Sequence, residues 1–331
     1  MCATELPAPW REALAEGVVE WEGDPGFVAA VAPDGSLLVR IWVPEVRNEL
    51  WWHPVDGEPV LVHDLGFAYR NLGVVGADTD GRYVAYGLTR WDHGETWALY
   101  VWDSQAGAAP VPLIEFGPEE WGMLHPPIVH DGQVYWAHRA EGGSTTTLYR
   151  YRIADGANDV VHTGNLGGPK RGGDLLIWPE WTDQSGESEL RALDLATGEQ
   201  AEGLPAVLTD RVARMQGLAG AAGVLAWVEG NANEQLWLWR ADWEAPARIL
   251  IEEEHTVGYL SVTTDLLAWQ QGRVYLLDQR TGGYALLTEE YGGVALSGPW
   301  LLLSYPSPDK TQPDPEVLID TRTLPPLPGC D

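Results

Sequence analysis

Residues 99–107, LYVWDSQAG, contain the pattern that decides the fold of this chain. A leading apolar residue starts a run of aliphatic and aromatic residues, and the run ends in Asp before a glycine turn. Six further segments share this pattern: LWWHPVDG from Leu50, LYRYRIADG from Leu148, LRALDLATG from Leu190, LWLWRADWE from Leu236, VYLLDQRTG from Val274 and VLIDTRTLP from Val317. Successive copies start 38 to 49 residues apart. This spacing is the period of a four-stranded β-propeller blade, so the seven copies predict seven blades.

Further strands surround each copy. The segments GSLLVRIW, GRYVAYGL, GQVYWAHR, GDLLIWPE, GVLAWVEG, TDLLAWQQ and GPWLLLSY precede the seven copies and follow Gly or Asp tips, as strands leaving tight turns do. A shorter apolar segment follows the first six copies: PVLVHDL, PVPLIEF, DVVHTGN, the weak EGLPAVL, ARILIEE and YALLTEE. With an innermost strand ahead of each set, every repeat predicts a four-stranded antiparallel meander.

The seventh copy has no fourth strand after it, because the chain continues as LPPLPGCD and prolines suit a sheet ladder poorly. The N-terminal segment GVVEWEG, residues 17–23, is a strand without a blade of its own. We expect this segment to pair with the strand beginning at Val317 and to close the ring, which removes open sheet edges. The sequence thus predicts an all-β, seven-bladed propeller that occupies residues 1–331 as one domain.

The segments AVAPDGSLLVRIW and GADTDGRYVAYG resemble the repeats of the TolB-like and WD40-like propellers, of the PD40 type. In that family an Asp-Gly turn joins the two inner strands, as at Asp34-Gly35, Asp80-Gly81 and Asp131-Gly132 here. Blades four to seven depart from the Pro-Asp-Gly pattern. The resemblance implies the architecture, without an attached hydrolase domain, and it implies no particular activity.

Composition excludes several classes of partner. The chain has 49 acidic and 20 basic side chains, a net charge of −29, so it is repelled by nucleic acid and by anionic lipid surfaces. No apolar run approaches the roughly 20 residues that span a bilayer. The N-terminal stretch also lacks the regions of a signal peptide. We expect no nucleic-acid partner, no membrane insertion and a monomer.

Motifs for catalysis are mostly missing. There is no G-x-S-x-G nucleophile elbow, P-loop or G-x-G-x-x-G, and no cofactor is expected. His125, His130 and His138 fall within fourteen residues, but the turn after His130 argues against their convergence on one metal or substrate. Asp78-Thr79-Asp80-Gly81 has the spacing of a calcium loop, yet Tyr83 and Ala85 replace the next ligands. An ordinary turn is favoured there, and no metal site is predicted.

The tryptophans and tyrosines divide into two groups. Tyr86, Trp136, Trp178, Trp227 and Trp269 recur at one position of the blade, which indicates packing between blades. Tyr69, Trp91, Trp121 and Trp181 instead lie in loops that a propeller meander brings to one face. Exposed rings near a funnel stack on sugars or on apolar peptide groups.

Basic residues are few, and Lys170, Arg171 and Arg211 precede blades four and five on that same face. They suit an anionic group or balance local carboxylates such as Asp174 and Asp210. Together with His125, which opens an inner strand, the predicted binding residues are Tyr69, Trp91, Trp121, His125, Lys170, Arg171, Trp181 and Arg211. The favoured function is a non-enzymatic propeller that binds a protein, peptide or glycan at its channel mouth. The alternative is a polysaccharide lyase or glycosidase that uses His125.

Cys2 and Cys330 are the two cysteines of the chain. Closure through the N-terminal strand brings both tails to one neighbourhood, so we predict a disulfide between them. A disulfide implies a compartment outside the cytosol and a removed leader. Lipidation of Cys2 gives the same location without a bridge, and two free thiols in a cytosolic protein stay open.

Overall fold

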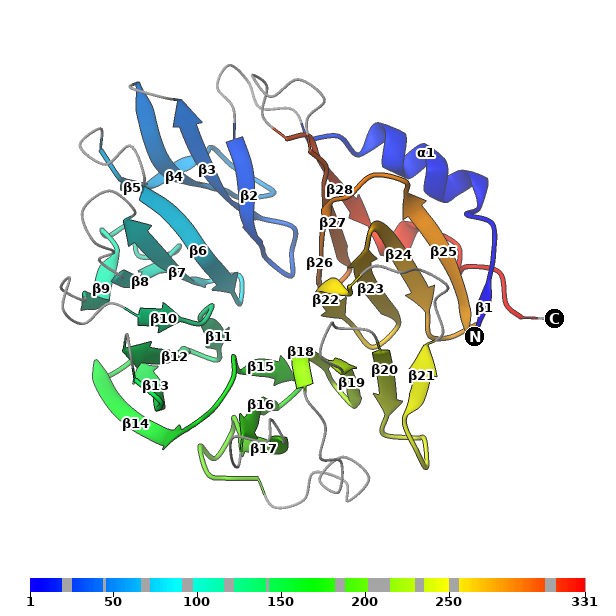
Figure 1. Ribbon diagram of the computed structural model, residues 1–331. Helices are drawn as coiled ribbons and strands as arrows, with labels where there is room; N and C mark the ends of the chain where they lie inside the picture. The colour runs from blue at the N-terminus through cyan, green and yellow to red at the C-terminus, as the bar shows by residue number, and fades with distance from the viewer. Residues whose placement is uncertain are drawn as a thin grey trace. The chain divides into compact units, whose positions relative to one another are not determined.

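The computed structural model describes residues 1–19, 26–43, 46–66, 72–90, 98–115, 122–140, 143–181, 188–201, 215–229, 235–249, 256–306 and 314–330. The chain separates into two compact units (Figure 1), one formed by Trp21–Pro169 and the other by Met1–Glu20 with Lys170–Asp331.

The unit of Trp21–Pro169 contains three antiparallel sheets, which are blades one to three. Blade one consists of β2 (Gly26–Val31), β3 (Leu37–Val43), β4 (Arg47–His53) and β5 (Val60–Asp64). Blade two consists of β6 (Leu72–Thr79), β7 (Tyr83–Arg90), β8 (Ala98–Asp103) and β9 (Val111–Glu115). Blade three has a divided inner strand, β10 (Gly122–Leu124) and β11 (Ile128–His130), followed by β12 (Gln133–Ala140), β13 (Thr146–Arg152) and β14 (Ala157–Gly164).

The other unit contains blades four to seven. Blade four has β15 (Lys170–Gly172), β16 (Leu175–Trp181) and β17 (Ser188–Asp194), and the weak segment EGLPAVL lies outside the described residues. Blade five consists of β18 (Met215–Ala221), β19 (Val224–Glu229), β20 (Gln235–Arg240) and β21 (Ala247–Ile249). Blade six consists of β22 (Gly258–Val262), β23 (Leu266–Gln271), β24 (Arg273–Asp278) and β25 (Gly283–Thr288). Blade seven has β26 (Gly293–Ser297), β27 (Trp300–Ser304) and β28 (Glu316–Asp320).

The seven sheets confirm the predicted fold class, an all-β propeller of seven blades with antiparallel, four-stranded meanders. Each of the seven sequence copies forms the third strand of its blade, from β4 in blade one to β28 in blade seven. Within each unit the innermost strands of successive blades are in contact, as β2 with β6 and β18 with β22. Among the described residues no helix is long and apolar enough to cross a bilayer.

In blades two, four and six an Asp explains why the third strand ends where it does. The Asp that ends the strand accepts a hydrogen bond from the backbone N–H two residues later, at 2.9 Å for Asp103 with Gln105 and for Asp194 with Ala196. Four residues after the Asp, glycine adopts a left-handed conformation, with φ of 62° at Gly107 and 73° at Gly198. Asp therefore fixes the turn through its side chain, and Gly supplies the backbone conformation that the turn needs.

The recurrent aromatic residues are core, as predicted. Tyr86, Trp136, Trp178, Trp227 and Trp269 are all at most 2% exposed. In four blades the ring stacks on an aromatic partner directly opposite on the third strand: Tyr86 on Tyr100, Trp136 on Tyr149, Trp227 on Trp237 and Trp269 on Tyr275. In blade four the residue opposite Trp178 is Arg191. Such cross-strand pairs stabilise a sheet beyond the area they bury.

The N-terminal segment joins blade seven. Val18 bridges antiparallel to Val317, with the Val19 N–H donating to the Glu316 carbonyl at 2.8 Å and the Leu318 N–H donating to the Gly17 carbonyl at 2.9 Å. Residues 20–23 of the predicted strand lie outside the described residues. Before this strand the chain forms a helix that the sequence analysis did not predict, α1 (Ala8–Glu16), which packs on β28. Its Trp10 is 1% exposed within the core of blades six and seven.

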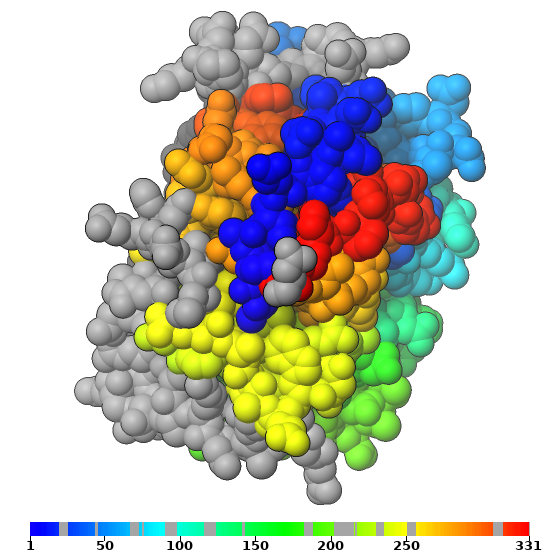
Figure 2. Space-filling view, turned by 90° about the vertical axis from the view of Figure 1, so that its right-hand side faces the viewer, coloured from blue at the N-terminus to red at the C-terminus, as the bar shows by residue number. Residues whose placement is uncertain are grey.

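Both ends of the chain reach blade six. The strand β1 (Cys2–Ala3) pairs in parallel with Gly283–Tyr284 of β25 and adds a fifth strand to that sheet. Cys2 and Cys330 form a disulfide with a Cα–Cα distance of 5.7 Å. The C-terminal tail is anchored beside it, because the Trp10 indole donates to the Pro325 carbonyl at 2.8 Å and the Leu327 N–H donates to the buried Asp278 carboxylate. Figure 2 shows the blue N-terminal and red C-terminal segments side by side.

Candidate functional site

The predicted binding residues fall into three groups. Tyr69, Trp91, Trp121 and Arg211 lie outside the described residues. His125 belongs to blade three in the unit of Trp21–Pro169, whereas Lys170, Arg171 and Trp181 belong to blade four in the other unit.

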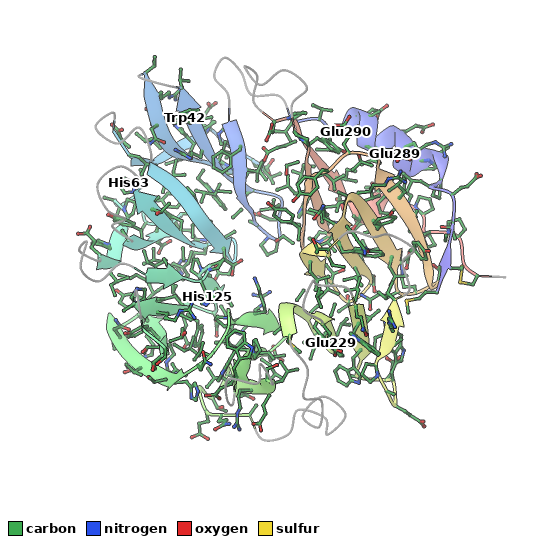
Figure 3. The ribbon with its side chains drawn as sticks, in the orientation of Figure 1. Trp42, His63, His125, Glu229, Glu289 and Glu290 are labelled. Carbon is green, nitrogen blue, oxygen red and sulfur yellow. A yellow bond between two sulfur atoms is a disulfide. The ribbon has the colours of Figure 1, made fainter. Side chains whose placement is uncertain are left out.

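His125 lies in the break of the inner strand of blade three (Figure 3). Both β10 and β11 pair with β12, and residues 125–127 separate them. The His125 N–H still donates to the Ala137 carbonyl at 2.9 Å. Pro126 and Pro127 follow, and because proline has no N–H the ladder cannot continue through them. The sequence His-Pro-Pro therefore causes the break.

Two glycines make room for this break. A Cβ at Gly168 would lie 2.8 Å from Nδ1 of His125, so the imidazole occupies the space that any other residue would need. A Cβ at Gly76 would lie 2.7 Å from Cβ of Pro126. The half-buried His125 ring thus packs on the glycine-rich segment NLGGPKRGGD, in which Lys170 follows Gly168 by two residues. Sequence alone did not reveal this contact.

The three histidines of blade three lie at different levels of the sheet. His130 pairs with Gln133 at the hairpin turn, and His138 pairs with Leu124. Five residues of β12 separate these two levels, which corresponds to about 17 Å along an extended strand. His130 and His138 are therefore at opposite ends of β12, as the sequence analysis expected.

In blade four, Lys170 and Arg171 lie on the inner strand β15, opposite Ile177 and Leu176 of β16. Arg171 is exposed and Lys170 is half-buried. Trp181 ends β16 and is half-buried, opposite Ser188. Because Trp181 follows Ile177 by four residues, it is displaced by about 13 Å along the strand from the level of Lys170.

Inner strands are irregular at one recurring level. In blades one, two, five and six one extra residue interrupts the pairing of the inner strand: Ala29 in β2, Val75 in β6, Gln216 in β18 and Tyr259 in β22. In blade three the same level holds residues 125–127. In blades two, three, five and six the interruption lies within two residues of the position opposite the buried aromatic of that blade. Such bulges re-aim side chains and are common beside binding sites.

Tyr259 is an exposed aromatic side chain at one of these interruptions. It is 60% exposed and has a φ of 24°, a conformation that side chains other than glycine rarely adopt. Tyr291, before blade seven, is 62% exposed. Neither residue was predicted from the sequence to bind a ligand. A usable signal was present, because Gly258 precedes Tyr259 and two glycines follow Tyr291 where the chain enters an inner strand.

The calcium-like spacing at Asp78 and Asp80 has a structural explanation. Asp80 accepts hydrogen bonds from the N–H groups of Arg82 and Tyr83, at 3.0 and 2.8 Å, and so forms the favoured turn. Asp78 accepts from the N–H of Val129, at 2.8 Å, and links blade two to blade three. Within the described ranges no group of three or more His, Cys, Asp or Glu side chains is arranged to hold a metal ion.

A titratable cluster lies between blades one and two. His63 Nδ1 is 2.9 Å from the Tyr86 hydroxyl, and the Tyr100 hydroxyl donates to Glu115 at 3.0 Å. Burial lowers the pKa of His63, with the Asp64 carboxylate opposing that shift. Burial, with the Glu115 carboxylate, raises the pKa of Tyr100 to about 12. Both pKa shifts favour the neutral forms of His63 and Tyr100, which act here as packing and hydrogen-bonding residues.

No protein-family model matches the chain, and no curated protein matches it. Many solved structures share its fold. A structure from a study of two prolyl endopeptidases has a TM-score of 0.63 and 15% identity over 97% of this chain and 51% of the other. Acylaminoacyl peptidase of Pyrococcus horikoshii has a TM-score of 0.57 and 13% identity over 87% and 52%. A chain of the mitotic checkpoint complex has a TM-score of 0.53 and 13% identity over 97% and 98%.

The chain therefore spans about half the length of the peptidase chains that it matches. At these identities the likeness shows the propeller fold alone.

Proposed function

We propose that this protein is a non-enzymatic binding propeller that holds a protein or peptide segment against its inner strands. The observation that carries the proposal is the interruption of the inner strands at one level in blades one, two, three, five and six. A regular inner strand alternates its side chains between the two neighbouring blades. An extra residue interrupts this alternation of side chains. In β22 the extra residue is Tyr259, and its ring is exposed.

The break at His125 supports the same function. Three residues leave the ladder there, and the imidazole packs against Gly168. Imidazole, ammonium and guanidinium groups donate hydrogen bonds to carbonyl or carboxylate oxygens, which every peptide provides. We retain the eight residues predicted from the sequence as binding residues.

The likeness to peptidases favours a peptide over a glycan as the ligand. Prolyl endopeptidases and acylaminoacyl peptidases are named for peptide substrates, and this chain matches about half of their length. Their catalytic activity belongs to those proteins. A glycan ligand, or a polysaccharide lyase or glycosidase that uses His125, is a competing outcome of the test below.

The test is a selection from a random peptide library displayed on phage, with the purified protein as bait. We expect reproducible enrichment of peptides that also bind the Trp42→Ala variant. Trp42 is an exposed ring of blade one outside the proposed residues and serves as the matched control. Peptide binding should weaken in the variants His125→Ala, Lys170→Ala with Arg171→Ala, and Trp181→Ala.

Absence of enrichment over the blocked support would overturn the proposal. So would equal binding of the selected peptides by all these variants. Binding on a glycan array without peptide binding would assign the protein to carbohydrate, and formation of unsaturated or reducing ends from a polysaccharide would make it an enzyme.

We also propose that the protein works in an oxidising compartment, outside the cytosol. The disulfide between Cys2 and Cys330 supports this location, because such bonds persist in secreted and periplasmic proteins and are rare in the cytosol. Alkylation of thiols in intact producing cells, before lysis, tests it. Two alkylated cysteines in the native host would contradict the proposal.

A further inference from the structure

Blades six and seven present two exposed tyrosines next to their inner strands. Tyr259 and Tyr291 are the most exposed aromatic side chains among the described residues, at 60% and 62%. Aromatic rings of this size are normally placed where packing or a ligand covers them. Neither ring belongs to the core clusters of blades five to seven.

The fold holds the Tyr259 ring away from the core. The neighbouring Leu260 and Val262 pack in the core between blades five and six, and Tyr259 is the extra residue between the pairs Gly258–Gln270 and Leu260–Trp269. Its strand β22 is covered by β23 behind and contacts β18 and β26 on its two sides. An exposed side chain on such a strand faces the solvent side of the inner strands.

The second tyrosine lies near the same level. The Leu296 N–H donates to Ser261 Oγ at 2.9 Å, which aligns β22 with β26 at these two residues. Counting two residues back on each strand brings Tyr259 level with Val294. Tyr291 lies three residues before Val294, which is about 10 Å farther along an extended chain. Both rings thus lie near the end of the blades at which the inner strands begin.

Carboxylates accompany the rings. Glu289 and Glu290 (Figure 3) directly precede Tyr291 and are exposed. Glu289 forms an ion pair with Arg273 at 3.0 Å. Burial and the negative charge of Glu290 raise the pKa of Tyr305, so the Glu290 carboxylate lies close to that half-buried ring. The whole chain carries a net charge of −29.

We propose that Tyr259, Tyr291 and Glu290 form a subsite for a basic side chain, an arginine or lysine, of the bound peptide. The proposal rests on the proposed function and names the chemistry of its ligand. A tyrosine face attracts a cation through its ring quadrupole, and an adjacent carboxylate adds a charge-assisted hydrogen bond. The negative charge of the protein raises the rate of encounter with basic segments.

The experiment uses the full-length protein labelled with ¹³C in its tyrosine rings. Three acetylated and amidated probe tripeptides, Gly-Arg-Gly, Gly-Gln-Gly and Gly-Glu-Gly, are titrated while the ring signals are recorded. The variants Tyr259→Phe and Tyr291→Phe assign the two signals and retain the aromatic faces. We expect the arginine probe to shift both signals and the glutamine and glutamate probes to leave them unchanged.

Removal of a ring gives the second measurement. Tyr259→Asn keeps a residue that tolerates positive φ, so we expect the melting temperature to stay at or above that of the parent. Affinity for arginine-containing peptides from the phage selection should fall roughly five- to thirty-fold, the effect of losing a cation–π contact. Trp42→Ala, the matched exposed ring of blade one, should leave that affinity unchanged.

The outcomes separate the two proposals. Equal shifts with the arginine and glutamine probes would overturn the basic subsite, as would selected peptides that contain no Arg or Lys or that bind Tyr259→Asn normally. Each of these results leaves peptide binding itself intact. Failure of the phage selection would instead overturn the proposed function.

Discussion

Loss of the Cys2–Cys330 disulfide should destabilise the protein measurably without unfolding it. The bridge joins residues 328 positions apart. The chain-entropy relation makes closure of a loop of that length worth about 6 kcal/mol, and native disulfides that have been removed cost about 2–5 kcal/mol. Hydrogen bonds from Thr4 and Leu327 hold both tails without the bridge, so the reduced native state gains little freedom. We therefore expect a loss near the upper part of the measured range, about 4 kcal/mol.

This loss predicts a specific change in melting temperature. The entropy of unfolding is about 2.1 cal/mol/K per residue, or roughly 0.7 kcal/mol/K for 331 residues. A loss of about 4 kcal/mol then lowers the melting temperature by about 6 °C.

Calorimetry of the double variant Cys2→Ser with Cys330→Ser measures the shift, and wild-type protein in excess dithiothreitol should match it. The single variant Cys330→Ser, kept reduced, should behave like the double variant. A shift below about 1 °C would refute the entropic argument. Two reactive thiols in the unfolded, unreduced protein would show that the bridge does not form.

Three further predictions test packing and protonation. Trp269→Ala, at a fully buried ring, should lower the free energy of unfolding by about 3–5 kcal/mol. Trp42→Ala, at a ring 42% exposed, should change it by less than about 0.5 kcal/mol. Chemical denaturation measures both variants, and equal effects would contradict the packing role of Trp269. Gly168→Ala should lower the free energy of unfolding by about 1–3 kcal/mol, because the added Cβ would clash with His125 Nδ1. Adding His125→Ala should recover most of that loss, whereas a purely additive double-mutant cycle would argue against the contact. Burial lowers the pKa of His63 below 6.5 in the folded state, so His63 binds a proton more readily in the unfolded state. Stability should therefore fall as the pH drops below about 6.5, and His63→Gln should flatten that part of a urea-denaturation series; an unchanged slope would remove His63 as its cause.

The predictions that succeeded from the sequence are those that depend on local, repeated chemistry. The seven copies each contain an apolar strand and, in most blades, an Asp that caps the following turn, and both features act within a few residues. The repeat places Trp269 and its four counterparts at the same level of blades two to six, so their burial also follows from periodicity. The pairing of residues 17–19 with β28 could be predicted because an orphan strand and an incomplete blade leave one economical partner.

The tertiary structure decided the features that join distant residues or break the repeat. No local signal places the His125 ring on Gly168, because that contact joins segments 43 residues apart in the chain. Both tails reach blade six, where β1 pairs with β25 and Trp10 of α1 packs in the core of blades six and seven. This route likewise depends on a free sheet edge that exists only after folding. The sequence by itself determined the number, order and strand content of the blades, since these rest on periodicity within about 40 residues. The candidate binding residues rest on departures from that period, and only contacts between blades reveal which departures expose a side chain.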